Sequence, residues 1–599
     1  MNALLPLVVA VPLLAGAAVT AVSHFLPRSV DDIVGIVAAT AATALAAVLL
    51  VEAQGADQLH WFGGWHPRGG IAIGISFYAG PLQAGLATLV CGLATIALAY
   101  SWRYFDESGA LFVVLMLMFV GAMCGFVLSG DVFNMFVFFE LMGVAAYALT
   151  AYRVDEIAPL QGALNFAITN SVGAFMILVG ISLLYARTGA LNLAQIATTL
   201  AHRPADGLVI VAFTLLTVGF LVKAAIVPFH FWLADAYAVA PAPVCVLFSG
   251  AMCELGLYGV ARIYWPTFAQ PLAPHASGVR AVLVAVAAMT LVVGAVMAFI
   301  QRHLKRMLAY ATISGLGLVL VGVALLDAKG LGGAAGLVLS EGLLRGALFL
   351  AAGVLLQRLD STDELQLRGS GRAFPLLGVL WLLAVVGLMG VPFVGSFSGH
   401  ELVDEAARSR GFGWLPPLVL AASAVTAAAL LRAGARVFLG WGAPDDPLLT
   451  PQPREREPEP TETPLALMLT ATAVLVAAGL VVSVVPGLDH RLVDGGHRFQ
   501  DVHGYVAQAL RGRSLPGEPR RPFDVPAPTL AGTLYGIGAG AGAVLLAAWA
   551  LRRRRPGAGI LRRPVGLLRE LHTGAVGDYV MWIAVGAAVM GGIWTLTLR

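Results

Sequence analysis

Charged side chains are scarce in this sequence, and their scarcity argues against a soluble fold. Asp, Glu, Lys and Arg make up 12% of its 599 residues, whereas about 25% is usual in soluble domains. Hydrophobic residues make up 59%. Such a composition is typical of a protein that crosses a membrane many times.

Cysteine and the common ligand-binding motifs are also rare or missing. The four cysteines lie in apolar runs and form no Cys-x-x-Cys pair, so we predict no disulfide framework, haem attachment or metal cluster. No glycine-rich phosphate loop follows a strand pattern, and no basic stripe carries interleaved aromatic residues. With a formal net charge of only +3, we expect no nucleic-acid partner. We also expect no cofactor, no metal and no catalytic site of the chain's own.

Apolar runs recur along the whole chain at the length of about 20 residues that a bilayer requires. We predict an all-α polytopic membrane protein with about sixteen transmembrane helices. The run at residues 3–22 lacks a basic leader and a cleavage site, so we interpret it as a span and not as a signal peptide. Two runs, 207–239 and 373–408, are too long for one span and contain proline.

Five regions are predicted along the chain. The tract DDPLLTPQPREREPEPTETP separates the last region from the rest, because its proline and charge content cannot bury a core. The regions are the N-terminal helices (1–110), a first half with helices four to eight (111–266), a second half with helices nine to thirteen (279–439), a polar linker (440–463), and C-terminal helices with a possible amphipathic segment along the membrane at 489–512 (464–599).

The loop charges predict an orientation in the membrane. Lys and Arg cluster most strongly in loops that follow odd-numbered spans, as at Arg302, Arg306 and Arg552. The positive-inside rule places such loops in the cytoplasm. We therefore expect an integral protein of a bacterial plasma membrane with both termini outside, and an external loop or hairpin at residues 55–76.

Ionisable side chains within apolar runs are the strongest functional signal, because charges at membrane depth are costly and usually face a bundle interior or water. An arginine can hold an anion there but cannot release its proton. The candidate residues for proton translocation are Glu140, Lys223, His230, Glu254, Lys305, Glu341, Arg345, His400 and Glu401.

Each of these residues also has a purely structural interpretation. Glu140 can be a carboxylate near a helix end or one that is hydrogen-bonded within the bundle. Lys223 and Glu254 can be fixed members of ion pairs, and a buried histidine such as His230 is often only a satisfied core residue. Lys305 stands at the start of a span, where its side chain can reach the lipid headgroups. Glu341 and Arg345 are four positions apart on one helix, which favours a local salt bridge.

Proline interrupts the two long apolar runs, 207–239 and 373–408, close to ionisable candidate residues. Pro228 follows Lys223 and precedes His230, and Pro392 precedes His400 and Glu401. Interrupted helices at membrane depth persist only beside protein or water. A buried lysine can lose its proton near neutral pH, because burial disfavours the charged form. Two interrupted helices in corresponding halves predict a transporter built from repeats.

Several stretches resemble the antiporter-like family of membrane subunits found in respiratory complex I, in Mrp-type cation/proton antiporters and in energy-converting hydrogenases. The resemblance covers roughly residues 110–410, and the ending LRELHTGAVGDYVMWIAVG is similar to the last helix of the longer, complex I subunit 5-type members. The other stretches are FFELMGVAAYAL, LVKAAIVPFHFWLADAYAVAPAPV, LFSGAMCELGLYGVARI and HLKRMLAYATISGLGLVLVG.

This resemblance implies two inverted five-helix repeats with interrupted helices 7 and 12, followed by extra C-terminal helices. It implies that Glu140 pairs with Lys223 as a proton-input switch and that a polar axis continues from there. Some positions depart from the family pattern, since Glu254 stands where lysine or histidine is usual. Glu341 and Arg345 replace a histidine and a lysine, and Gly399 stands where many members have lysine.

The resemblance implies a subunit that moves H⁺, with Na⁺ as a second candidate ion, in a complex I-like, Mrp-like or hydrogenase-like assembly. Its partners are then the other membrane subunits and the lipid bilayer, and any redox step belongs to those partners. The departures leave open a non-conducting structural subunit. A third hypothesis, a stand-alone transporter of a small organic solute, also stays open.

Overall fold

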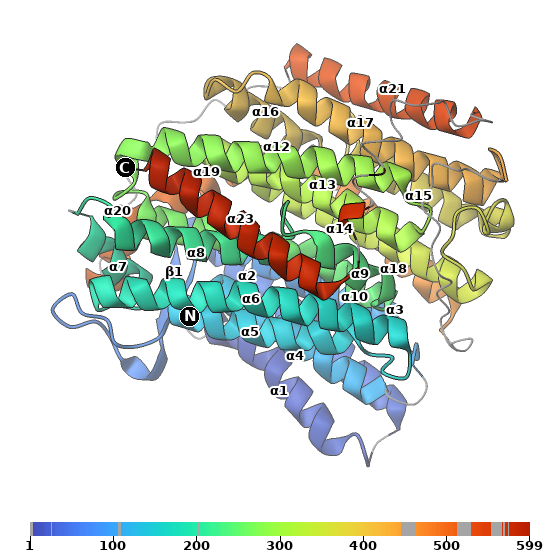
Figure 1. Ribbon diagram of the computed structural model, residues 1–599. Coiled ribbons are helices and arrows are strands. Elements are labelled where there is room, and N and C mark those ends of the chain that lie inside the picture. Colours follow the sequence, from blue (N-terminus) through green and yellow to red (C-terminus); the bar gives the residue numbers. More distant parts are fainter. Residues whose placement is uncertain are drawn as a thin grey trace.

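Long apolar helices that run roughly parallel to one another make up most of the computed structural model (Figure 1). The structure describes residues 4–25, 27–105, 109–201, 203–444, 463–511, 529–552, 566, 570–572 and 574–598. Within these residues, fourteen helices are long and apolar enough to cross a membrane. The predicted all-α polytopic fold is confirmed.

The N-terminal helices are joined by the only paired strands among the described residues. Strand β1 lies within residues 55–76, the predicted external loop or hairpin, and pairs with a strand that begins at the last residue of that segment. The pairing is antiparallel, and Gln58 faces Ala79. The elements are α1 (Leu4–Val22), α2 (Arg28–Gly55), β1 (Gln58–Trp61), β2 (Ser76–Ala79) and α3 (Pro81–Tyr100).

The first half contains the first interrupted helix, whose two parts are α8 and α9. Helices α10 and α11 are joined by a π-helical turn, Phe248–Met252, and belong to one continuous span, Ala242–Phe268. The helices are α4 (Gly109–Leu128), α5 (Val132–Thr150), α6 (Ile157–Thr188), α7 (Leu193–Leu200), α8 (Gly207–Lys223), α9 (Phe231–Val239), α10 (Ala242–Leu247) and α11 (Cys253–Ile263).

The second half contains the other interrupted helix, and further helices follow it. The predicted linker falls mainly on residues 445–462, which lie outside the described part of the chain. The helices are α12 (Ala276–Ile300), α13 (Leu304–Ala324), α14 (Ala328–Leu359), α15 (Pro375–Leu388), α16 (Phe397–Ser409), α17 (Leu415–Gly434), α18 (Leu465–Val481), α19 (Leu488–Gln500), α20 (Val502–Arg511), α21 (Leu530–Arg552) and α23 (Val576–Thr597).

Both interruptions lie where the sequence predicts them. Helix α8 ends at Lys223 and α9 begins at Phe231, while α15 ends at Leu388 and α16 begins at Phe397. The fourteen long helices and these two interrupted segments coincide with the apolar runs of the sequence. The inverted-repeat relation between the halves stays a prediction.

The C-terminal helices pack on both halves. Helix α21 lies against α17, and α23 lies against α6 and α8; Figure 1 shows them far apart, α21 at one edge of the bundle and α23 across the first half. The short helices α19 and α20, within the segment predicted to be amphipathic, contact α14 and α7 respectively. Whether they lie along the membrane stays a prediction.

Candidate functional site

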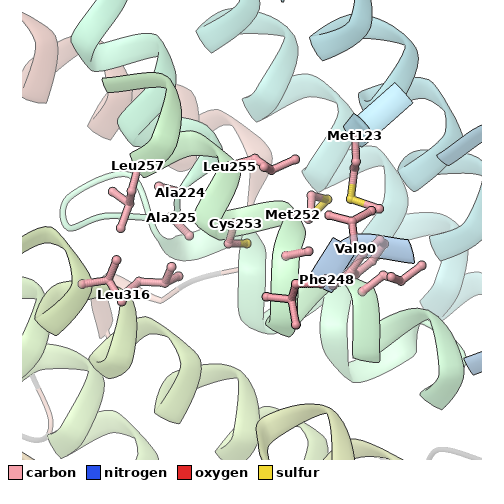
Figure 2. Close-up of a cluster of buried hydrophobic side chains, with 14 of the residues drawn as sticks. Val90, Met123, Ala224, Ala225, Phe248, Met252, Cys253, Leu255, Leu257 and Leu316 are labelled. Atoms are coloured by element: carbon pink, nitrogen blue, oxygen red, sulfur yellow. The ribbon is translucent and has the colours of Figure 1, made fainter. Parts of the chain in front are cut away.

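Helix α8 is interrupted in a tightly packed apolar environment. Figure 2 shows Ala224 and Ala225, just after Lys223, close to Cys253 and Leu257 of α11. The backbone groups freed by the interruption find specific partners, since Val227 N–H donates to Thr290 Oγ1 at 3.1 Å. Because a freed backbone group needs such a partner at membrane depth, these contacts hold the interruption in place.

Lys223 ends α8 in an aromatic cage. Its side chain is fully buried, and its Nζ atom has no hydrogen-bond partner among the described residues. The same atom lies 5.2 Å from the ring centroid of Phe139, 5.9 Å from that of Tyr147 and 5.4 Å from that of Phe166. Ring faces attract cations over such distances. The cage therefore holds an ammonium group without an anionic contact.

Glu140 does not form the direct ion pair with Lys223 that the family resemblance implies. No described carboxylate lies within 4.0 Å of Lys223 Nζ, although Glu140 and Lys223 attract each other electrostatically. The physical reason is that the rings of Phe139, Tyr147 and Phe166 surround the ammonium. The half-buried Glu140 carboxylate is held apart from it.

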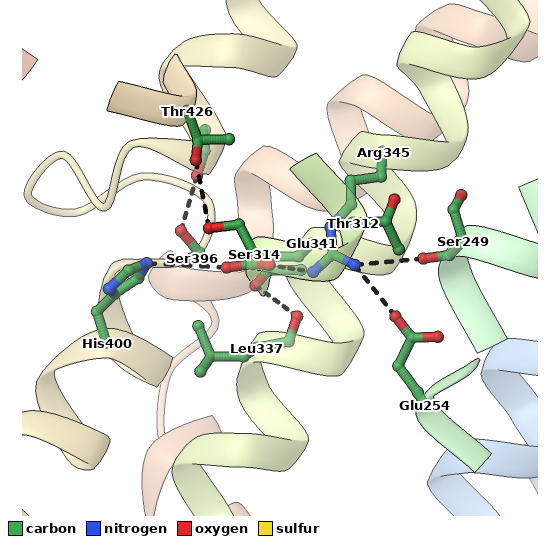
Figure 3. A network of polar contacts seen from close by, with 12 residues as sticks. Ser249, Glu254, Thr312, Ser314, Leu337, Glu341, Arg345, Ser396, His400 and Thr426 are labelled. Carbon is green, nitrogen blue, oxygen red and sulfur yellow. Dashed lines mark hydrogen bonds and ion pairs between the residues drawn. The ribbon is translucent and has the colours of Figure 1, made fainter. Parts of the chain in front are cut away.

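Four of the predicted residues meet in one buried network (Figure 3). Arg345 Nη1 lies 3.2 Å from Glu254 Oε1, and Arg345 Nη2 contacts Glu341 Oε2. The other Glu341 oxygen lies 3.8 Å from Nε2 of His400. The i, i+4 salt bridge is thus present, and it extends to two further helices.

One cation in this network faces two carboxylates. Arginine stays charged at any physiological pH, so only the carboxylates and His400 can exchange protons there. Arg345 is 2% exposed and Glu254 is 2% exposed. Removing one member of such a pair leaves an uncompensated buried charge, which is strongly unfavourable. Arg345 therefore acts as a fixed countercharge for Glu254 and Glu341.

Two small cavities extend the network towards α17 and α21. The first, of about 40 Å³, is lined by Glu341, Arg345 and Ser423. The second, of about 30 Å³, is lined by His400, Asp404 and Ser423. Both exceed the volume of roughly 10–15 Å³ that one water molecule requires. Ser423 borders both cavities, so polar groups continue from one to the other.

Two side chains connect the network with the region of Lys223. The Tyr237 hydroxyl lies 3.2 Å from Cys253 Sγ, next in sequence to Glu254. Cys253 interacts electrostatically with Lys223 and with Arg345. Tyr237 and Cys253 thus form a polar contact next to Glu254, within electrostatic range of both Lys223 and Arg345.

Lys305 does not reach the lipid headgroups, and that interpretation is wrong. Its side chain is 0% exposed, and its Nζ atom donates to the carbonyl oxygen of Ala238 at 2.6 Å. Ala238 lies in the last turn of α9, where unpaired carbonyls and the helix dipole favour a cation. Lys305 thus stabilises the end of the helix that follows the first interruption.

Glu401 lines the second cavity together with His400 but forms no ion pair with the described residues of the central network. One of its oxygens accepts hydrogen bonds from the backbone N–H and the hydroxyl of Thr529, at 2.5 and 2.9 Å. Thr529 immediately precedes α21. Glu401 therefore connects the second interrupted helix to the C-terminal extension.

The structure adds residues that the sequence prediction missed, all near the first interruption. His572 Nε2 lies 3.1 Å from His230 Nε2. Asp235 pairs with Arg306 at 3.2 Å and accepts a hydrogen bond from the Tyr579 hydroxyl at 2.7 Å. The criterion of a charge within an apolar run includes Asp235 as well. No feature of the local sequence shows that His572 and Tyr579 lie near Asp235 and His230.

Comparison with known proteins relates this chain to one family. Residues 129–426 match the family described as "NADH:quinone oxidoreductase/Mrp antiporter, TM". The chain is 32% identical over 403 residues to the NADH-quinone oxidoreductase subunit N of Desulforudis audaxviator (strain MP104C), covering 66% of this chain and 78% of that protein. It is 28% identical over 399 residues to a Na(+)/H(+) antiporter subunit of Bacillus subtilis (strain 168), covering 65% and 77% respectively.

Solved structures share the fold. A chain of an archaeal membrane-bound sulfane sulfur reductase aligns with a TM-score of 0.74 and 26% identity, covering 85% of this chain and 100% of that one. A chain of the Mrp complex from Dietzia sp. DQ12-45-1b aligns with a TM-score of 0.74 and 24% identity, at the same coverage. The family match, the related sequences and the shared fold agree, and the chain belongs to the NADH:quinone oxidoreductase/Mrp antiporter family of membrane subunits.

Proposed function

We propose that this chain translocates protons, with Na⁺ as a second candidate ion, as an antiporter-like subunit of a multisubunit membrane complex. The observation that carries the proposal is the series of buried ionisable groups between the two interrupted helices. It leads from Lys223 past Tyr237 and Cys253 to Glu254, Arg345, Glu341 and His400. Such groups at membrane depth are typical of proton relays.

In this mechanism, Lys223 alternates between two surroundings. In the aromatic cage its ammonium has no anionic contact, whereas movement towards Glu140 forms an ion pair. Forming and breaking that pair changes how strongly Lys223 holds its proton, because a nearby opposite charge favours the charged form. His230 lies beside the interruption and exchanges protons with this region.

Carboxylates carry the proton through the central network. Arg345 holds Glu254 and Glu341 on either side of its guanidinium, so a proton on one carboxylate leaves the other paired with the cation. Water in the two cavities beside Ser423 connects Glu341 with His400 and Asp404. The departures from the family pattern thus replace a lysine relay with a carboxylate relay around a fixed cation.

The proposal also covers the partner subunits of the chain and its orientation in the membrane. Related proteins named as subunits of NADH-quinone oxidoreductase and of a Na(+)/H(+) antiporter support partners that are other membrane subunits of a complex I-like, Mrp-like or hydrogenase-like assembly. The loop charges support an orientation with odd-numbered loops in the cytoplasm and both termini outside, and the bacterial relatives support a bacterial plasma membrane.

Replacement of Lys223 tests this function. In proteoliposomes containing the assembled complex, we expect Lys223→Ala to abolish proton translocation while the subunits still co-purify. Lys329→Ala is the matched control, because Lys329 forms a half-exposed ion pair with Glu405. Unchanged pumping by the Lys223→Ala complex would refute the proposal.

A second candidate function is a non-conducting structural subunit. The fixed contacts of Arg345 with Glu254 and Glu341 favour it, because arginine cannot release its proton. Normal transport by the assembled complex after combined Glu140→Gln and Lys223→Ala replacement would select this candidate. Faster transport by Arg345→Lys would instead indicate that the second half conducts and that Arg345 limits it.

A further inference from the structure

Each of the two last helices covers one of the interrupted helices. A Cβ atom added to Gly586 of α23 would lie 2.8 Å from Pro228 Cγ, and one added to Gly536 of α21 would lie 3.1 Å from Pro392 Cδ. Both contacts require a glycine on the covering helix. These helices lie beyond residues 129–426, which the family match covers, so the match assigns them no role.

The segment just before α23 also brings a titratable side chain to the first interruption. His572, just before this helix, places its Nε2 atom 3.1 Å from Nε2 of His230. The two rings are nearly perpendicular, with an interplanar angle of 75°. The His572 ring also lies against the rings of Phe231 and Tyr310, with centroids 4.8 and 5.8 Å away. Three aromatic or imidazole rings thus pack against His572, which is half-buried.

Polar contacts fix this arrangement around Asp235. The hydroxyl of Tyr579, in the first turn of α23, donates to Asp235 at 2.7 Å. Arg306 of α13 approaches the other oxygen of Asp235 at 3.2 Å. Asn165 of α6 donates to the Gly574 carbonyl at 3.1 Å. Helices α9 and α6 thus hold Tyr579 and Gly574 directly, and α13 fixes Asp235 in turn, which keeps His572 facing His230.

Two Nε2 atoms that face each other at hydrogen-bond distance can share only one proton between them. When His572 is an imidazolium, its Nε2–H bond breaks and a new N–H bond forms at Nε2 of His230. His572 is then neutral with its proton on Nδ1, and His230 carries the charge. The reverse step restores the first state, so the pair moves one proton without any co-reactant.

We propose that His572 is a proton-transfer residue of this subunit, which passes protons to and from His230 at the first interruption. The C-terminal helix α23 then completes the pathway of the first half within the same chain. This inference rests on the proposed function, since it assigns a further residue to the same path. Asp235 and Tyr579 are positioning residues for this transfer.

Two replacements of His572 separate proton transfer from a merely structural role. In proteoliposomes with the assembled complex, we expect His572→Gln to lower proton translocation at least tenfold, because glutamine keeps hydrogen bonds but cannot carry a proton. His572→Glu restores a titratable group, and we expect it to recover a substantial part of the rate. His503→Gln, on the exposed side of α20, is the control that keeps full transport.

The outcomes distinguish this inference from the general function. Full transport by His572→Gln, while Lys223→Ala is inactive, would overturn the role of His572 and leave the proposed function intact. Equal losses in the Gln and Glu variants of an assembled complex would show that His572 is structural and would also overturn it. Residues that act in series are non-additive, so we expect His230→Gln to add no further loss to His572→Gln.

Discussion

Gly586 lies directly against Pro228, the proline within the first interrupted helix. A Cβ atom at position 586 would be 2.8 Å from Pro228 Cγ and 2.5 Å from Phe229 Cε1. Neither neighbour is the end of a flexible chain, so any side chain at 586 must displace α23. The last helix of the chain is thus fitted to the interruption and is more than a peripheral anchor.

The first prediction concerns this fit. We expect Gly586→Leu to separate α23 from the interruption, because overpacking of a close contact typically costs about 1–3 kcal/mol. The measurement is disulfide cross-linking between cysteines introduced at positions 591 of α23 and 214 of α8, because a Cβ atom at 591 would lie 3.4 Å from Thr214 Cγ2. This cross-linking should fall sharply. Gly592→Leu is the control, since a Cβ at 592 has no neighbour within 4 Å. Equal cross-linking in both variants would contradict the fit.

The second prediction concerns the aromatic cage. Phe166 lies 5.4 Å from Lys223 Nζ and stacks on Trp232 at 4.3 Å. A cation–π contact contributes about 0.5–2 kcal/mol, so we expect Phe166→Leu to lower the transport rate about 2- to 30-fold.

The same helix supplies the control for the cage. Phe175 of α6 is 66% exposed on the outer surface of the chain, and Phe175→Leu should leave transport unchanged. Transport assays of both variants in the assembled complex check the prediction. A rate that falls equally for both replacements would assign the loss to helix packing and not to the cage.

The third prediction concerns the charge balance of the central network. Arg345→Met leaves Glu254 and Glu341 buried without a cation, and breaking a buried ion pair typically costs about 3–5 kcal/mol. We expect the free energy of unfolding to fall by about that amount in detergent. Arg345→Lys keeps the charge and should lose much less. Intrinsic fluorescence during denaturant titration measures the stability of both variants. Equal stability of the Arg345→Met and Arg345→Lys variants would contradict the role of Arg345 as a countercharge.

The fourth prediction compares two lysines of similar chemistry. Lys305 is fully buried and bonds to the Ala238 carbonyl at 2.6 Å, whereas Lys329 and Glu405 form a pair in which each side chain is 30% exposed. A hydrogen bond from a charged group contributes about 1.5–3 kcal/mol, and an exposed ion pair about 0–1 kcal/mol. Lys305→Gln should therefore destabilise the chain more than Lys329→Gln. The reverse order of thermal unfolding temperatures would contradict the buried role of Lys305.

Periodicity and composition predicted the local features well. The apolar runs became helices, and the interruptions formed at Pro228 and Pro392, because both depend on short stretches of chain. The pairing of Glu341 with Arg345 was equally accessible, since positions four apart share a helix face. The addition of Glu254 and His400 to that pair depends on contacts between helices, which the local sequence does not specify.

The sequence by itself determined that this chain forms a membrane bundle with charges at depth, because hydropathy and proline act within a single helix. Only the tertiary structure decided which charges meet. It placed Lys223 in an aromatic cage apart from Glu140, buried Lys305 against the end of α9, and brought His572 to His230 from 342 positions away. Each of these contacts depends on how separate helices pack, and packing follows from the shape of the whole bundle.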